Sequence, residues 1–187
     1  MPLGLGHAVW CARRLLTDDE PFAVVLTDDV IMGDPPCLQQ MIEAHAETGG
    51  SMVATMEVPR EKTKSYGVLD VAEDMGAIVR AKGMVEKPEP QDAPSNLAAA
   101  GRYILDRKIF DALRRIEPGA GGELQLTDAI ALLIEEGEPV HVVVHHGTRH
   151  DLGNPGGYLK AAVDFALDRD DYGPDLREWL EKRLADG

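Results

Sequence analysis

The stretch that most constrains the fold is an apolar run ending in two acids, FAVVLTDD at residues 22–29. An unbroken apolar run rich in Val predicts a strand buried on both faces, as in a parallel sheet covered by helices. Ligands of open α/β sheets bind at the carboxyl ends of strands. Asp28 and Asp29 are therefore candidates to bind a divalent cation, and through it a phosphate. The alternative is that both acids only form a turn or cap the next element.

Apolar runs and helical patterns alternate along the rest of the chain. The patterns predict strands at 22–29, 51–58, 66–71, 77–80, 96–105 and 140–146, and helices at 8–16, 34–46, 106–113, 123–136, 158–168 and 174–185. A turn signal at 73–76 joins the third and fourth strands. We expect an α/β fold: a Rossmann-like mixed, mainly parallel sheet flanked by helices. Residues 1–187 are predicted to form one domain, with 170–187 as a terminal helix that docks on its own domain or on a neighbouring subunit.

The charge balance excludes several classes of partner. The chain carries 33 acids and 19 bases, a formal net charge of −14, which repels nucleic acid and anionic membranes. No apolar run approaches the roughly 20 residues that a membrane span needs, and the beginning does not resemble a secretory signal. Two cysteines are too few for a disulfide framework. We therefore expect a cytoplasmic protein that binds neither nucleic acid nor membranes.

Three further segments carry candidate functional residues. Gly4 and Gly6 precede the first helix, where bare backbone N–H groups can face an anion or a base edge, although such glycines also form plain turns. Pro88 is expected to make Lys87 extended, so that Glu86 and Lys87 point to opposite sides and do different tasks. The alternative there is a solvated loop. Asp151 is a second carboxylate at a predicted strand-to-helix junction.

These pieces together resemble a family, the bacterial UTP–glucose-1-phosphate uridylyltransferases, within the sugar-phosphate nucleotidyltransferases. The resemblance covers nearly the whole chain, and its strength lies in the order of the segments rather than in any one of them. The matching segments are PLGLGHA (2–8), LTDD (26–29), YGV (66–68), VEKP (85–88), GRY (101–103), GELQLTDAI (122–130) and DLG (151–153).

The resemblance implies that glucose 1-phosphate and UTP react to give UDP-glucose and pyrophosphate, with Mg²⁺ neutralising the phosphates. It places Gly4 against the uracil and Gly67 at the sugar. Glu86 would accept hydrogen bonds from glucose hydroxyls, and Lys87 would bind the sugar phosphate. Asp28 and Asp151 would be the Mg²⁺ ligands, and the catalytic set would be Asp28, Lys87 and Asp151. The resemblance also implies a homo-oligomer.

One departure from the family pattern shapes the expectation. The family opens with a strand and a glycine-rich loop that carries an arginine and a lysine, and no such segment precedes Pro2. The expectation is an N-terminally truncated chain that is inactive alone. Two alternatives remain open: a non-catalytic sugar-nucleotide-binding or oligomerisation module, and a structural remnant without a ligand.

Overall fold

The computed structural model describes residues 3–16, 19–72 and 78–185. Contacts divide the chain into two compact units. Unit 1 comprises Met1–Leu26 and Met32–Gly147, and unit 2 comprises Thr27–Ile31 and Thr148–Gly187. The sequence pattern did not indicate this division, because unit 2 combines a short early segment with the end of the chain.

The strands of unit 1 form, within the described residues, one six-stranded sheet. In sheet order they are β1 (Phe22–Val25), β6 (Leu97–Leu105), β3 (Ser51–Glu57), β7 (Val140–Val144), β5 (Ile78–Glu86) and β4 (Gly67–Val71). Strands β1, β3, β4 and β7 share one direction, and β5 and β6 run in the other. The mixed sheet is confirmed. Because β6 lies between β1 and β3, and β5 between β7 and β4, only β3 and β7 are parallel neighbours among the described pairs.

The strand predicted at 22–29 is shorter and less buried than expected. It ends at Val25, and its residues alternate between partly buried and exposed, Val25 being 45% exposed. The reason is its place at the sheet edge, where it pairs with β6. Burial on both faces is found instead in β6, in which every residue except Arg102 is buried, and in the first five residues of β3. The prediction of full burial at residues 22–26 is therefore wrong, although the strand itself is confirmed.

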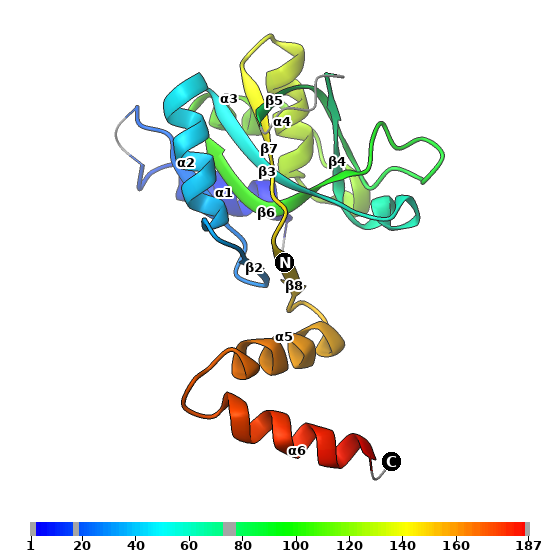
Figure 1. The fold of residues 1–187 in the computed structure, drawn as a ribbon. Coiled ribbons are helices and arrows are strands. Elements are labelled where there is room, and N and C mark those ends of the chain that lie inside the picture. The colour runs from blue at the N-terminus through cyan, green and yellow to red at the C-terminus, as the bar shows by residue number, and fades with distance from the viewer. Residues whose placement is uncertain (1–2, 17–18, 73–77, 186–187) are drawn as a thin grey trace. The chain divides into compact units, whose positions relative to one another are not determined.

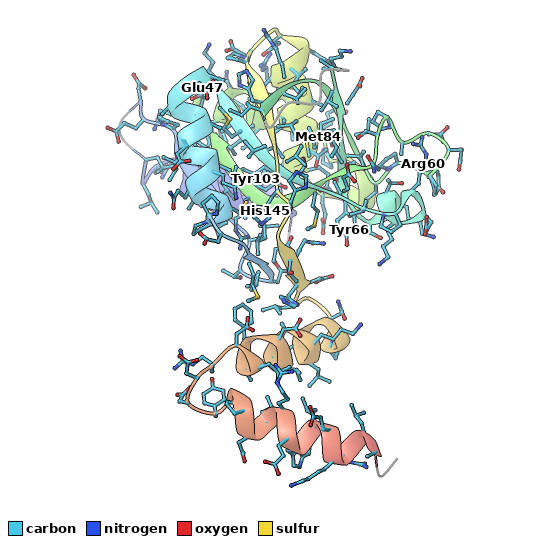
Figure 2. All side chains as sticks on the ribbon, viewed as in Figure 1. Glu47, Arg60, Tyr66, Met84, Tyr103 and His145 are labelled. Atoms are coloured by element: carbon cyan, nitrogen blue, oxygen red, sulfur yellow. The ribbon has the colours of Figure 1, made fainter. Side chains whose placement is uncertain are left out.

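Helices cover both faces of this sheet (Figure 1). One face packs against α1 (Leu5–Ala12), α3 (Lys108–Arg115) and α4 (Leu126–Glu135), and the other packs against α2 (Cys37–Thr48). Apolar residues of α4 recur with helical spacing and are buried in the core: Leu126, Ala129, Ile130 and Leu133. Met84 and Tyr103, labelled in Figure 2, belong to the same core. Two 3₁₀ turns, Arg60–Ser65 and Ala120–Gly122, complete unit 1.

The hairpin predicted around residues 66–80 is confirmed, because β4 and β5 pair antiparallel. The turn predicted at 73–76 lies outside the described residues, as does Pro2 of the glycine-rich start.

Unit 2 contains a two-stranded sheet and two helices. Strands β2 (Asp29–Met32) and β8 (Thr148–Asp151) pair with each other, and helices α5 (Pro155–Leu167) and α6 (Gly173–Ala185) follow. Asn154 caps α5, accepting a hydrogen bond from the Gly157 N–H at 2.8 Å. Little of this helix pair is buried: Ala161 in α5 and Gly173 in α6. None of the helices in the described part of the chain has the length and apolar character to cross a bilayer.

Candidate active site

The carboxylates of Asp28 and Asp151 converge in unit 2. The Leu152 N–H donates to the Asp28 carbonyl oxygen at 2.7 Å, which joins the two segments. Gly153 lies between the side chains. A Cβ added there would be 3.0 Å from Asp151 Oδ1 and 3.4 Å from Asp28 Oδ2. Both oxygens therefore lie near Gly153, whose N–H donates to Asp151 Oδ1 at 2.9 Å. Both residues are also exposed.

The second acid of the predicted pair, Asp29, is the first residue of β2 and has a different role. It is 6% exposed, and the Arg149 guanidinium donates to both of its carboxylate oxygens, with Nη2 lying 2.8 Å from Oδ2. This bidentate pair links β2 to β8. Of the two acids considered from the sequence, Asp28 is the one available to a ligand, and Asp29 supports the fold around it.

The donor set of Asp28 and Asp151 fits magnesium. Hard carboxylate oxygens are its preferred protein ligands, and Mg²⁺ is usually bound through one or two carboxylates together with water and substrate phosphates. Among the described residues no group of three or more His, Cys, Asp and Glu side chains gathers at metal-binding distance. A complete protein cage is therefore absent from the described part of the chain.

Unit 1 contains Glu86 and Lys87, and the structure corrects the sequence prediction about them. Lys87 is not extended: its φ is +47°, in the left-handed region. This turn directly after β5 brings the Lys87 Nζ to 3.2 Å from Glu86 Oε1. The two side chains are therefore an ion pair rather than side chains on opposite sides of a strand. The prediction that they point to opposite sides is therefore wrong.

Gly67 lies directly opposite Glu86 in the β4–β5 register. A Cβ at Gly67 would be 2.8 Å from Met84 Cε, 2.9 Å from Thr127 Oγ1 and 3.4 Å from Glu86 Oε2. Thr127, at the start of α4, donates its hydroxyl to Glu86 Oε2 at 2.7 Å. The glycine thus leaves room for a side-chain contact between Glu86 and α4. Its predicted contact with a sugar stays a prediction.

Asp128 follows Thr127 and adds a second acid to this region. Burial, and then the negative charge of Glu86, raise the pKa of the Asp128 carboxyl above its ordinary value of 3.8. The N-terminal end of α4 therefore places a hydroxyl and a carboxyl near Glu86.

Gly4 also lies beside the beginning of α4. It has a φ of +96°, and a Cβ there would be 2.7 Å from the Leu124 carbonyl oxygen. The Gly6 N–H donates to that same oxygen at 2.9 Å. Packing and backbone conformation are sufficient reasons for a glycine at this position. The predicted contact with uracil is not tested by them.

Sequence reasoning missed Thr127, Asp128 and Arg149 as contributors to the site. Thr127 and Asp128 were recognised only as part of the segment at 122–130, and no local pattern shows that they face Glu86. Arg149 carried no signal, because its partner Asp29 is 120 residues away.

Comparison with known proteins shows the family to which the chain belongs. Residues 1–167 match the family model described as nucleotidyl transferase. Over 151 residues, 81% of this chain, it is 48% identical to a protein of Komagataeibacter xylinus named UTP–glucose-1-phosphate uridylyltransferase. Over 185 residues, 99% of this chain, it is 39% identical to UTP–glucose-1-phosphate uridylyltransferase YngB of Bacillus subtilis. The chain spans 52% and 60% of the length of these two relatives.

Solved structures agree with the family match. A crystal structure of a UDP-glucose pyrophosphorylase complexed with UDP-glucose superposes with a TM-score of 0.85 and 37% identity, covering 90% of this chain and 64% of that one. A UTP-bound UGPase from Acinetobacter baumannii superposes with a TM-score of 0.83 and 33% identity, covering 96% of this chain and 62% of that one.

Proposed function

The chain belongs to the nucleotidyl transferase family, and on that basis we propose that this protein is a UTP–glucose-1-phosphate uridylyltransferase. A phosphate oxygen of glucose 1-phosphate attacks the α-phosphorus of UTP, the bond from that phosphorus to the bridging oxygen breaks, and UDP-glucose and pyrophosphate form. The observation that carries this proposal is the 48% identity with a relative of that name.

The side chains of unit 1 have the chemistry for the sugar phosphate. Glu86 accepts hydrogen bonds from sugar hydroxyls, and Lys87, which is exposed, supplies a positive charge for the phosphate. Their 3.2 Å contact keeps a hydrogen-bond acceptor beside a cation. A sugar phosphate carries the complementary groups, hydroxyl donors beside an anionic phosphate. Gly67 and Gly4 would approach the sugar and the base through their backbones.

The side chains of unit 2 have the chemistry for magnesium. Asp28 and Asp151 would be its protein ligands, and bound Mg²⁺ would neutralise the crowded phosphate oxygens. The protein's own contribution is positioning: the Asp29–Arg149 pair and the Leu152–Asp28 hydrogen bond keep the two carboxylates together before any ligand binds.

Calorimetry with UDP-glucose, with and without Mg²⁺, tests the proposal. We expect Asp151→Asn and Asp28→Asn to weaken binding mainly when Mg²⁺ is present. Asp170→Asn, which changes an exposed carboxylate elsewhere in unit 2, is the matched control and is expected to bind like the wild type. An equal loss with and without the metal would remove the two acids from the metal role. No heat at millimolar UDP-glucose would contradict the function itself.

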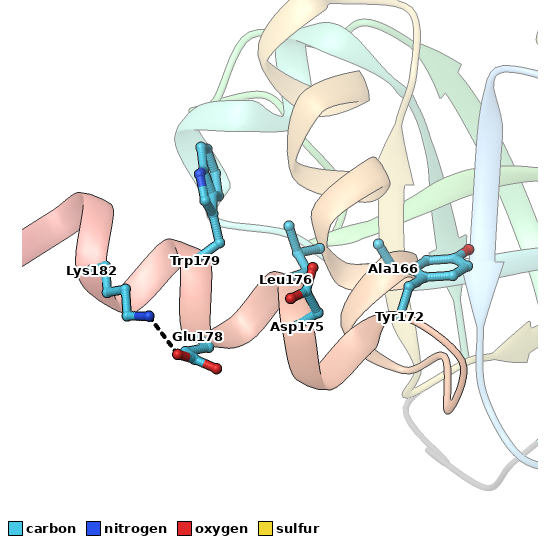
Figure 3. A pocket seen from close by; sticks show the side chains of 7 residues that line it. All are labelled: Ala166, Tyr172, Asp175, Leu176, Glu178, Trp179 and Lys182. Carbon is cyan, nitrogen blue, oxygen red and sulfur yellow. Dashed lines mark hydrogen bonds and ion pairs between the residues drawn. The ribbon is translucent and has the colours of Figure 1, made fainter.

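We also propose that the chain self-associates through α6. Large apolar side chains of this helix and of the turn before it are exposed, Trp179 by 58% and Tyr172 by 49%. They line one groove with polar neighbours, as Figure 3 shows: Ala166, Tyr172, Asp175, Leu176, Glu178, Trp179 and Lys182.

A second copy of this chain is the partner that the charges of α6 favour. The first turn contains the acid Asp175, and the last turn contains the bases Lys182 and Arg183, of which Lys182 also pairs with Glu178 of the same helix. Two α6 helices in antiparallel contact would therefore bring the acidic start of each opposite the basic end of the other, as a two-fold interface requires. Docking on its own chain is the alternative.

A further inference from the structure

Glu86 is held by a residue from a different element. The Thr127 hydroxyl donates to Glu86 Oε2 at 2.7 Å, although the residues are 41 positions apart. Thr127 is 7% exposed and the Glu86 side chain 14% exposed, so water competes little for this contact. A hydrogen bond to a charged acceptor in such surroundings is among the stronger kinds in proteins.

The surrounding residues leave this contact little freedom. Gly67 lies beside the Thr127 hydroxyl, and a Cβ there would also meet Cε of Met84, which is 5% exposed. Because a Cβ at Gly67 would lie 2.9 Å from Thr127 Oγ1, no larger residue fits without displacing the hydroxyl. Thr127 itself lies in α4, whose first residue, Leu126, is buried in the core. The donor is therefore anchored by the fold rather than by a flexible loop.

The charges around Glu86 make a positioned donor useful. Lys87 attracts Oε1 from the end of β5, while Asp128 on α4 repels the carboxylate. Lys87 and Asp128 act on Glu86 through their charges, which do little to fix the orientation of its carboxylate. The hydroxyl of Thr127 acts along one hydrogen-bond direction and so selects one orientation of the carboxylate.

We propose that Thr127 is a positioning residue for the sugar-binding carboxylate of Glu86. Its hydroxyl bonds Oε2, so that Oε1 stays beside Lys87 and accepts hydrogen bonds from the hydroxyls of a hexose phosphate. The inference rests on the proposed function, because Glu86 matters to a sugar only if the site binds one. In this role Thr127 acts through Glu86 rather than by a contact of its own with the substrate.

Valine and serine at position 127 separate this role from simple packing. Valine keeps the shape and removes the hydroxyl, whereas serine keeps the hydroxyl and removes a methyl group. We expect Thr127→Val to weaken UDP-glucose binding by about tenfold or more, as the loss of a hydrogen bond to a charged group predicts. Thr127→Ser should retain most of the wild-type affinity. Calorimetry on the full chain measures both.

Thr55→Val is the matched control. Thr55 is a fully buried threonine of unit 1 whose hydroxyl has no hydrogen-bond partner in the described structure. The same chemical change there should leave UDP-glucose affinity unaltered. If Thr127→Val binds like the wild type, or if valine and serine at 127 weaken binding equally, the positioning role is wrong.

Crystal structures of the ligand-free chain test this inference independently of the proposed function. In Thr127→Val the Glu86 carboxylate should leave the orientation that it has in the wild type and in Thr127→Ser. An unchanged carboxylate overturns the positioning role. A displaced carboxylate in Thr127→Val, together with a wild type that binds no UDP-glucose, supports the positioning by Thr127 and contradicts the proposed function instead.

Discussion

The guanidinium of Arg149 donates hydrogen bonds to both carboxylate oxygens of Asp29, which lies 120 residues earlier in the chain. Their side chains are 12% and 9% exposed. Asp28 precedes Asp29, and Asp151 lies two residues after Arg149. The ion pair therefore connects the two segments that carry the candidate magnesium ligands, without using either ligand.

Removing one partner of this pair should destabilise unit 2. In Arg149→Met the buried Asp29 charge loses its bidentate partner, which typically costs about 3 kcal/mol. We expect amide hydrogen exchange in β2 and β8 to report a local unfolding free energy lower by about that amount. Affinity for Mn²⁺, a spectroscopic substitute for Mg²⁺, should fall as well, because Asp28 and Asp151 are no longer kept together.

The control for that change is Arg169→Met. Arg169 and Asp171 also form an ion pair in unit 2, but their side chains are 60% and 59% exposed. Exposed pairs contribute at most about 1 kcal/mol. Equal effects of the two substitutions would show that the Asp29–Arg149 pair has no special structural role.

A side chain at residue 153 should disturb the two candidate metal ligands directly. In Gly153→Ala the new Cβ would lie 3.0 Å from Asp151 Oδ1, closer than ordinary contact, and 3.4 Å from Asp28 Oδ2. We expect Mn²⁺ affinity to fall several-fold in a titration followed by electron paramagnetic resonance. Gly156→Ala, whose Cβ meets Asn154 Oδ1 at an ordinary 3.5 Å, should bind like the wild type. Unaltered affinity in Gly153→Ala would separate these carboxylates from the metal.

The Asp128 carboxyl should make the stability of the fold depend on pH. Its pKa is raised by burial and by Glu86, so the folded state binds this proton more tightly than the unfolded chain does. Its stabilising contribution is therefore present below the ordinary pKa of 3.8 and is lost as the pH rises from there through the raised value. In Asp128→Asn this loss should be absent, which denaturant unfolding at a series of pH values measures.

Glu86→Gln tests the electrostatic part of the same shift. Removing the negative charge should lower the pKa of Asp128 toward 3.8, but only in part, because burial is the larger cause. The carboxyl ¹³C resonance of Asp128, followed by NMR against pH, reports the change. An unchanged titration would show that the two carboxyls do not interact.

Trp179→Gln should reduce self-association. The exposed indole lies in the groove of Figure 3, so its loss removes apolar area from the proposed contact between two copies. Sedimentation velocity over a range of concentrations should show a smaller average species for this variant. Tyr158→Gln removes an aromatic side chain that is 59% exposed outside the groove and should sediment like the wild type. A wild type that stays monomeric would contradict the association.

Prediction from sequence succeeded where a signal is local. The helix predicted at 123–136 contains α4, and the run of small and apolar residues at 96–105 indicated β6. Prediction failed where the burial of a strand depends on the strands beside it in the sheet. The apolar run at residues 22–26 has the composition of a buried strand, but its burial depends on which strands flank it, and it lies at an edge.

The sequence by itself determined most of the elements, the family likeness and the identity of the candidate residues, because periodicity and motif order are properties of the chain alone. It did not indicate the short strands β2 and β8, which pair across more than 100 residues. Only the tertiary structure decided which of the candidate residues meet. In the structure Asp28 lies near Asp151, and Asp29 pairs with Arg149. Lys87, with a φ of +47°, contacts Glu86, and Thr127 donates a hydrogen bond to the same carboxylate. The physical reason is that hydrogen bonds and ion pairs act over a few ångströms of space, and packing of the units decides which distant residues come that close.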